Sequence, residues 1–320
     1  MSHPQACTRR ALLGAILGII LMLGAAGAGA QAFPSKPVRV IVPFPPGGGA
    51  DALARILGPR LTEIWGQQVI IENRPGASGH IGADFVAQSA ADGYTLLMSS
   101  TASLTQKNVD QFAPVSLVSA SAYIVAANPR LAASNIRELI ALAKASPGKL
   151  TFGSSGTGAA SHLAAELFKS MAGVDLLHVP YKGTGPMLTD LIAGQTQATS
   201  AGTPPLLPHV KSGKLRAIAV GTPQRIAALP DVATVAQQGY PGFETSQWYG
   251  IIVPAKTPEA IVKKLAEEIA KATKSPEVLE RFRNDGTIAV GSTPAEFAEF
   301  IQKEQARWGE VVRKSGVKAE

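Results

Sequence analysis

The chain has 320 residues and a formal net charge of +7, from 30 Lys and Arg residues against 23 Asp and Glu residues. The basic residues are dispersed, and the longest basic run after residue 32 is Lys263-Lys264, so the clustered patch typical of nucleic-acid-binding proteins is absent and no nucleic-acid partner is expected. A mildly positive chain of this length fits two lobes and a small anionic ligand.

Residues 1–32 have the pattern of a cleaved export signal. Arg9 and Arg10 precede an apolar stretch, Ala11–Leu23, and a run of small residues, Gly24–Ala32, offers cleavage sites of the small-x-small type. The apolar stretch is shorter than the ~20 residues that span a bilayer, which favours cleavage over an uncleaved anchor. The adjacent arginines leave a twin-arginine signal open. Cleavage would remove Cys7, so the mature chain would have no disulfide, thiolate nucleophile or Cys-ligated zinc.

Short apolar runs then alternate with helical patterns, which is typical of βαβ units around a parallel sheet. In the first series, Val38–Pro43, Val69–Ile71 and Thr95–Met98 are predicted strands. Asp51 is expected to cap a helix that runs to about Ile64.

A second series begins with a predicted strand at Tyr123–Ala127. Asn135 and Glu138 form a capping box for a helix to about Lys144. Further strands are predicted at 150–152, 176–179 and 217–220, and three late helices are expected to start at Thr257-Pro258, Ser275-Pro276 and Thr293-Pro294.

No long linker separates the two series, so the chain is expected to cross between two α/β lobes and return. The crossings are placed near Tyr123 and Tyr249. This predicts one lobe from residues 33–123 and 250–320, and a second lobe from residues 124–249.

Two glycine-rich connections each follow a strand and open a helix. In that position consecutive backbone N–H groups point outward at the positive end of the helix dipole, which favours an anion. The alternative is that both are only tight turns. The candidate ligand-binding residues are Phe44, Pro46, Gly47, Gly48, Gly49 and Asp51 in the first connection, and Ser154, Ser155, Gly156, Thr157, Gly158, Ser161 and His162 in the second.

Further polar residues follow strands and are candidates for the same cleft. These residues are Ser99, Ser100 and Thr101 after the third strand, and Tyr181 and Lys182 in the connection that ends at Pro186. The histidines at 80, 162, 178 and 209 have no metal-ligand spacing, so neither a metal nor a cofactor is predicted.

Enzymatic signatures are weak. There is no G-x-S-x-G nucleophile elbow and no phosphate-binding G-x-x-x-x-G-K-[ST]. Residues 156–161 approximate G-x-G-x-x-G but end in Ser161, and Asp175 stands at the start of the next strand, where its carboxylate would face the wrong end. A binding protein is favoured over an enzyme; a carboxylate-processing enzyme of the same architecture is the alternative.

At these connections the chain resembles the Bug family, the periplasmic receptors of tripartite tricarboxylate transporters. The resemblance extends over essentially all of the chain after the signal. Its motifs are the segments 34–51, 72–77, 91–96, 153–158, 178–183 and 248–258. It implies the type II-like fold of periplasmic binding proteins, with two α/β lobes, two crossover segments and a ligand cleft. It also implies a carboxylate ligand held by both glycine connections.

Two departures from the family pattern lie near the expected cleft. Gln197 stands where family members usually have Asp, and the segment Leu104–Phe112 is shorter than usual. Ser200, at the end of the small, polar strand from Thr196, is also expected near the ligand. The departures leave the identity of the carboxylate open.

The sequence therefore predicts an exported periplasmic protein that acts as a monomer and binds a small organic anion. The ligand is expected to be a di- or tricarboxylate, an amino acid or an aromatic acid. Delivery to membrane transporter subunits and delivery to a sensor kinase both remain open.

Overall fold

The computed structural model describes residues 33–315, with side chains as far as Arg313. The predicted export signal, including Cys7, lies outside the described residues. Within them, no helix combines the length and the apolar character that a membrane span requires. Residues 36–315 belong to one compact unit.

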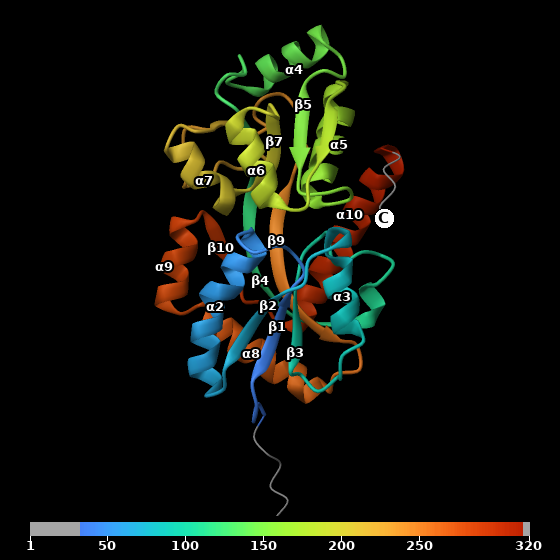
Figure 1. Ribbon diagram of the computed structural model, residues 1–320, viewed down its shortest axis with the longest axis vertical. Coiled ribbons are helices and arrows are strands. Elements are labelled where there is room, and N and C mark those ends of the chain that lie inside the picture. The colour runs from blue at the N-terminus through green and yellow to red at the C-terminus, as the bar shows by residue number, and fades with distance from the viewer. Residues whose placement is uncertain (1–32, 316–320) are drawn as a thin grey trace, which may run out of the picture. The chain divides into compact units, whose positions relative to one another are not determined.

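The described strands form one ten-stranded sheet in the order β2-β1-β3-β9-β4-β7-β5-β6, with β8 and β10 also paired to β4 (Figure 1). The first α/β lobe uses the parallel strands β1, β2 and β3. Their bounds are Val38–Val42, Val69–Asn73 and Thr95–Ser99. Its helices are α2 (Gly49–Trp65), α3 (His80–Ala87), α8 (Glu259–Thr273), α9 (Pro276–Asn284) and α10 (Pro294–Ser315), and β10 (Thr287–Ala289) lies between the last two in the chain.

The second lobe repeats the parallel pattern. Strand β5 lies between β6 and β7, in parallel with both. The strands are β5 (Thr151–Ser154), β6 (Leu177–Pro180), β7 (Ala198–Gly202) and β8 (Arg216–Val220). Around them lie α4 (Ile136–Ala145), α5 (Ala160–Ala172), α6 (Thr184–Ala193) and α7 (Thr203–Lys211), in the upper part of Figure 1.

Two long strands join the lobes, which is the two-crossover arrangement that the sequence predicts. Strand β4 (Phe112–Ala127) pairs with β9 (Ser246–Pro254) as far as Ala122, and from Tyr123 onward it pairs with β7 and β8. The change of partners falls at the predicted first crossing. The exact lobe boundaries stay a prediction.

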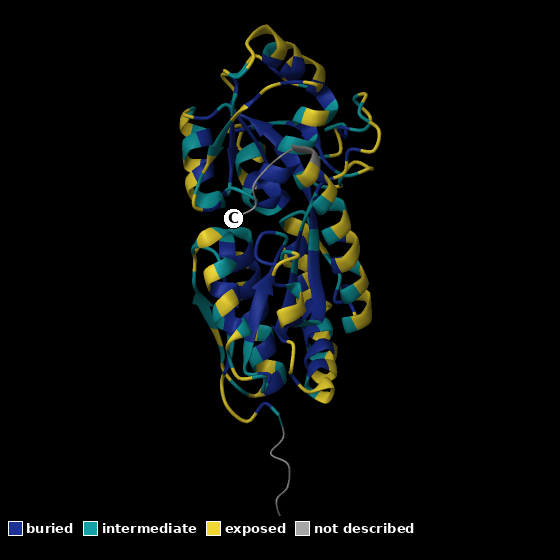
Figure 2. Ribbon diagram, turned by 90° about the vertical axis from the view of Figure 1, so that its right-hand side faces the viewer, coloured by how far each residue is buried: buried dark blue, intermediate teal, exposed yellow. Residues whose placement is uncertain are grey.

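The predicted strands are confirmed, but β4 begins 11 residues before the predicted Tyr123–Ala127 (123 − 112 = 11). Ser116, Ser119 and Ser121 are buried in this first part. Alternating small residues and Pro114 give the segment little strand character in the sequence. Its central position in the sheet buries most of its residues, and the strands of the sheet are largely in the dark blue of buried residues in Figure 2.

Helix starts follow the predicted caps in part. Asn135 caps α4 by accepting from the Glu138 N–H at 2.9 Å, and Thr293 and Glu296 form the expected reciprocal box before α10. Two predicted caps are wrong. Gly48, not Asp51, is the N-cap of α2, and Pro258, not Thr257, is the N-cap of α8, because the Thr257 hydroxyl donates instead to the Pro254 carbonyl at 2.8 Å.

Each lobe has its own apolar core. In the first lobe, Trp248 from β9 packs edge-on against Phe297 and Phe300 of α10, with ring centroids 5.8 and 5.6 Å away. In the second lobe, Phe168 of α5 packs against Phe243 and with the buried Phe152 of β5. These cores hold the strand ends that carry the glycine connections.

Candidate ligand-binding cleft

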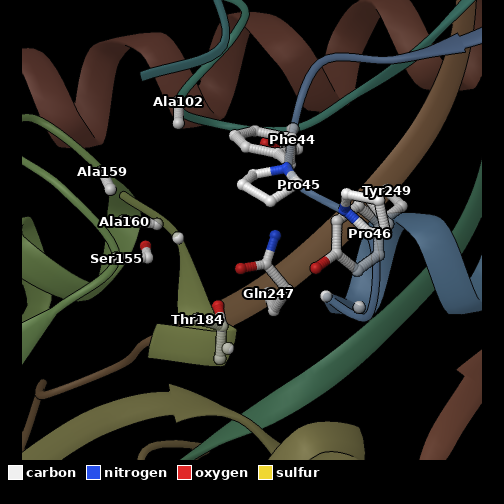
Figure 3. Close-up of a pocket in the computed structure, with 16 residues that line it drawn as sticks. Phe44, Pro45, Pro46, Ala102, Ser155, Ala159, Ala160, Thr184, Gln247 and Tyr249 are labelled. Atoms are coloured by element: carbon white, nitrogen blue, oxygen red, sulfur yellow. The ribbon is translucent and has the colours of Figure 1, made fainter. Parts of the chain in front are cut away.

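A narrow cleft, with a cavity volume of about 50 Å³, lies where both lobes meet the crossover strands (Figure 3). The first lobe contributes Phe44, Pro45, Pro46, Gly48, Gly49, Ala50, Ser100 and Ala102 to its lining; the second contributes Ser155, Ala159, Ala160, Gly183, Thr184 and Gly185; Gln247 and Tyr249 come from β9. A smaller adjoining pocket shares five of these residues and adds Tyr123, Ser161, Ala201, Gly202, Pro204 and Pro205.

Helix N-termini surround the cleft. Within the described residues, α2, α5, α6 and α7 begin at the lining, and their N-cap residues are Gly48, Ala159, Gly183 and Gly202. None of these caps makes a side-chain hydrogen bond, whereas Asn135 caps α4, away from the cleft. The first-turn N–H groups of α2, α5 and α6 therefore have no partner within their helices and can bind an anion. Helices α6 and α7 offer fewer donors, because Pro186 in the first turn of α6, and Pro204 and Pro205 in that of α7, have no N–H.

Asp51 holds the first glycine connection from behind. Its buried carboxylate accepts hydrogen bonds from the Gly47 N–H, the Arg55 Nε and the Asn73 Nδ2, all at 3.0 Å. Burial raises the pKa of Asp51, but the hydrogen bonds from Arg55, Gly47 and Asn73 outweigh burial and leave the pKa below its usual value. The carboxylate is thus ionised, paired and outside the cleft lining, and the Gly47 N–H already has an acceptor.

Serine hydroxyls hold the second glycine connection. Ser161 Oγ accepts from the Ser155 N–H at 2.9 Å and lies 2.9 Å from Ser155 Oγ. Ser154 Oγ accepts from the Gly156 N–H at 3.2 Å and lies 2.6 Å from His178 Nε2. These contacts fix the backbone from which Ala159 and Ala160 enter the cleft.

Two stacked histidines lie behind this connection. The rings of His162 and His178 are 3.8 Å apart and nearly parallel, and His162 Nδ1 accepts from the Gly158 N–H at 3.1 Å. Burial, followed by the charges of His162 and Lys169, lowers the pKa of His178 to about 4, and burial also lowers the pKa of His162. Both rings are therefore neutral at pH 7 and add no positive charge behind the cleft.

The glycine connections of the two lobes touch neighbouring loops across the cleft. Ser78, between β2 and α3, donates to the Thr157 carbonyl at 2.9 Å. A Cβ added to Gly183 would lie 3.3 Å from the Pro45 ring. The lobes are thus closed over the cleft on these sides.

Several predicted residues line the cleft or its adjoining pocket. These residues are Phe44, Pro46, Gly48, Gly49, Ser100, Ser155 and Ser161.

The other predicted residues lie outside the lining. The buried Ser99 donates to the Gly250 carbonyl at 2.9 Å, and Tyr181 donates to Asp190 Oδ2 at 2.8 Å. Thr101 and Gly158 line a different, apolar groove beside α10. Lys182 is exposed, and Ser200 is buried in β7. The remaining predicted residues support the two glycine connections through the contacts described above; they are Gly47, Asp51, Ser154, Gly156, Thr157 and His162. The Ser154 hydroxyl also donates to the Gly156 carbonyl.

Strand β9 contributes two cleft residues that were not among the predicted site residues. Gln247 and Tyr249 extend from β9 into the cleft, and Gln247 lies in the middle of the labelled side chains in Figure 3. Placing the second crossing near Tyr249 could have indicated both, because alternate residues of a strand share a face. Thr184, at the start of α6, was missed although its segment was singled out.

None of the described residues that line the cleft carries a charge. Nor do the described residues contain a group of three or more His, Cys, Asp or Glu side chains that could hold a metal ion. Any anion in the cleft would therefore be held by backbone and neutral side-chain donors.

The comparisons with known proteins agree with this geometry. The family model of the tripartite tricarboxylate transporter family receptor matches residues 53–317. Protein BugT of Bordetella pertussis is 38% identical over 317 residues, which cover 95% of this chain and 97% of BugT.

Two solved structures extend the comparison to ligands. A structure from R. palustris with adipate is 34% identical, has a TM-score of 0.86, and is matched over 89% of this chain and 99% of its own. MatC from Rhodopseudomonas palustris, with bound malate, is 30% identical, has a TM-score of 0.82, and is matched over 88% of this chain and 100% of its own. The resemblance stated from the motifs is confirmed, and the chain belongs to the family of tripartite tricarboxylate transporter receptors, which includes the Bug proteins.

Proposed function

We propose that this protein is an exported periplasmic receptor that binds a small organic carboxylate and delivers it to the membrane subunits of a transporter. The observation that carries the proposal is the convergence of three helix N-termini, those of α2, α5 and α6, on one cleft whose lining is uncharged. Backbone N–H groups at helix starts favour anions. The relatives with adipate and malate support the same ligand class.

The two glycine connections would bind the two ends of a dicarboxylate. One carboxylate would accept hydrogen bonds from the backbone N–H groups of Gly48, Gly49 and Ala50, at the start of α2. The other would accept from the first turns of α5 and α6. Ser100, Ser155 and Thr184 would add hydroxyl donors. Because the donors come from both lobes, the ligand itself would stabilise the closed arrangement.

An enzymatic function has less support. Ser154 and His178 form a serine–histidine contact of 2.6 Å, but Ser154 is 0% exposed and lies outside the cleft lining, so its hydroxyl cannot reach a bound ligand. A nucleophile must contact the substrate. Presentation of the ligand to a sensor kinase remains an alternative to transport, and pull-down of membrane components with the liganded protein would distinguish the two.

Titration calorimetry against mono-, di- and tricarboxylates tests the binding function. We expect dicarboxylates to bind, with the same affinity in the presence of a chelator, because the expected donors are protein N–H and O–H groups. A ligand at 100 times its Kd should also stabilise the fold by about 2.7 kcal/mol. Failure of every carboxylate to bind, or loss of binding with chelator, would contradict the proposal.

The proposed export implies a mature protein that begins after about residue 32. Intact-mass measurement of periplasmic material should give the mass of this shortened chain. A mass that still includes Cys7 would refute cleavage.

A further inference from the structure

Two neighbouring residues of the crossover strand β9 extend from the cleft floor toward the ligand space. Gln247 and Tyr249 are alternate residues on one face of β9, and both line the cleft (Figure 3). Each packs against a glycine: a Cβ on Gly202 would lie 3.1 Å from Gln247 Cβ, and a Cβ on Gly49 would lie 2.5 Å from the Tyr249 hydroxyl. The two side chains are therefore held in place by close packing.

The orientation of the Gln247 amide is fixed by its neighbours. The Tyr123 hydroxyl donates to Gln247 Oε1 at 2.8 Å, and Gln247 Nε2 donates to the Trp248 carbonyl at 3.0 Å. A flipped amide would place its oxygen against the Trp248 carbonyl oxygen, so the flip is disfavoured. Burial raises the pKa of Tyr123 well above its usual value, so the phenol keeps its proton. An amide has two N–H donors, and the second N–H of Gln247 is left for the cleft.

We infer that Gln247 is a specificity-determining residue, which selects dicarboxylates with a hydroxyl or keto oxygen on the carbon chain between the two carboxylates. The inference rests on the proposed function, which places the carboxylates at the helix N-termini on either side. Gln247 lies between these ends, where its free N–H meets the middle of the ligand. Tyr249 adds a hydroxyl to the same region.

The same geometry ranks three kinds of ligand. A hydroxyl or keto oxygen accepts from the Gln247 N–H. An unsubstituted chain leaves that donor unpaired after it has been removed from water, which weakens binding. An ammonium group is the least favourable, because it has only donors to place against another donor and because no carboxylate among the described lining residues would pair with it.

Calorimetry with two series of acids tests the ranking; within each series the carbon skeleton is constant and only the substituent changes. The probes are malate, succinate and aspartate, and the five-carbon series 2-hydroxyglutarate, glutarate and glutamate. We expect the hydroxy acid to bind roughly five- to tenfold more tightly than the unsubstituted acid, as for one hydrogen bond, and the amino acid to bind most weakly. In Gln247→Met, the preference for the hydroxy acid should fall to within about twofold, with the unsubstituted acid affected little.

Two further variants distinguish the loss of the amide hydrogen bond from a general change in packing. Gln302→Met removes an exposed glutamine from α10 and should leave every Kd unchanged. Tyr123→Phe keeps the Gln247 amide but frees its orientation, so the preference for the hydroxy acid should fall by about threefold. If thermal melting shows Gln247→Met unfolded, the result with Tyr123→Phe decides the question.

The outcomes separate this inference from the proposed function. Equal binding of malate and succinate by the wild-type protein, or an unchanged preference in folded Gln247→Met, overturns the role of Gln247 and leaves carboxylate binding intact. Failure of the wild-type protein to bind any acid of either series contradicts the proposed function and, with it, this inference. A preference for the amino acids would show that the cleft recognises an ammonium group and would also overturn the ranking.

Discussion

Replacing Gly48 with valine should weaken carboxylate binding at least about 100-fold and leave the protein folded. Gly48 has φ −81°, which any residue can adopt, and a Cβ there would meet only the Pro45 carbonyl oxygen, at 3.7 Å. The valine side chain would therefore occupy the space over the first N–H groups of α2. A hydrogen bond to a charged group contributes about 1.5–3 kcal/mol, so losing two costs about 3 kcal/mol or more. Calorimetry measures the loss, and circular dichroism checks the fold.

Matched variants make this result specific to the cleft. Gly185→Val, at the start of α6, also adds a side chain to open space and should weaken binding from the second lobe. Gly58→Ala, in α2 behind the cleft, makes only ordinary contacts and should bind normally. Gly156 is a poorer test, because φ is 146° there and any side chain is strained. If folded Gly48→Val bound normally and Lys182→Ala lost binding, the carboxylate would be held by a side-chain ion pair and not by the backbone N–H groups.

Gln247→Glu should weaken carboxylate binding by a similar factor, because it introduces a negative charge into the cleft. The variant keeps an oxygen for the Tyr123 hydroxyl but places a negative charge in a cleft whose described lining contains no cation. Two like charges about 5 Å apart repel by roughly 3 kcal/mol at an effective dielectric constant of about 20, which corresponds to more than 100-fold in Kd. Gln302→Glu introduces the same charge on the exposed face of α10 and should bind normally.

The loss in Gln247→Glu should also depend on pH. Burial and the neighbouring anion both raise the pKa of the new carboxyl group, so its neutral form becomes populated as the pH falls. The carboxyl group of the variant should be fully ionised at about pH 8.5 and partly neutral at about pH 6.5, so the variant should bind more tightly at the lower pH. The Kd of the wild-type protein should change little over that interval. Titrations at the two pH values measure this, and a pH-independent loss would mean that shape, not charge, prevents binding.

Local pattern was enough to predict most of the fold. The buried strands β1 and β3 are short apolar runs, and Thr293 with Glu296 forms a cap whose two partners are three residues apart. The first part of β4 could not be predicted in this way. Its alternating serines and alanines and its proline are typical of a loop, and the segment is a strand because β9 and β10 lie beside it.

The candidate site was predicted as far as it depends on the backbone. Glycine after a strand and before a helix identifies a possible anion site within a short segment, so Gly48 and Ser155 were found. Polar side chains were harder to assign, because a serine at a strand end can as readily bond to the backbone, as Ser99 does with the Gly250 carbonyl. Gln247 reaches the cleft because β9 crosses between the lobes; that crossing was placed near Tyr249, but no motif in the segment marks Gln247 as a cleft residue.

The uncapped helix starts around the cleft have a consequence for how such receptors can diversify. The groups that would attract the charge belong to the main chain, and most amino-acid replacements leave a main-chain N–H where it was. Side chains such as Gln247 and Ala102 can therefore change to other uncharged side chains by single substitutions and alter which acid fits, while the attraction for carboxylates as a class persists. Receptors of this architecture could thus change their ligand specificity one mutation at a time, without an intermediate that binds no carboxylate.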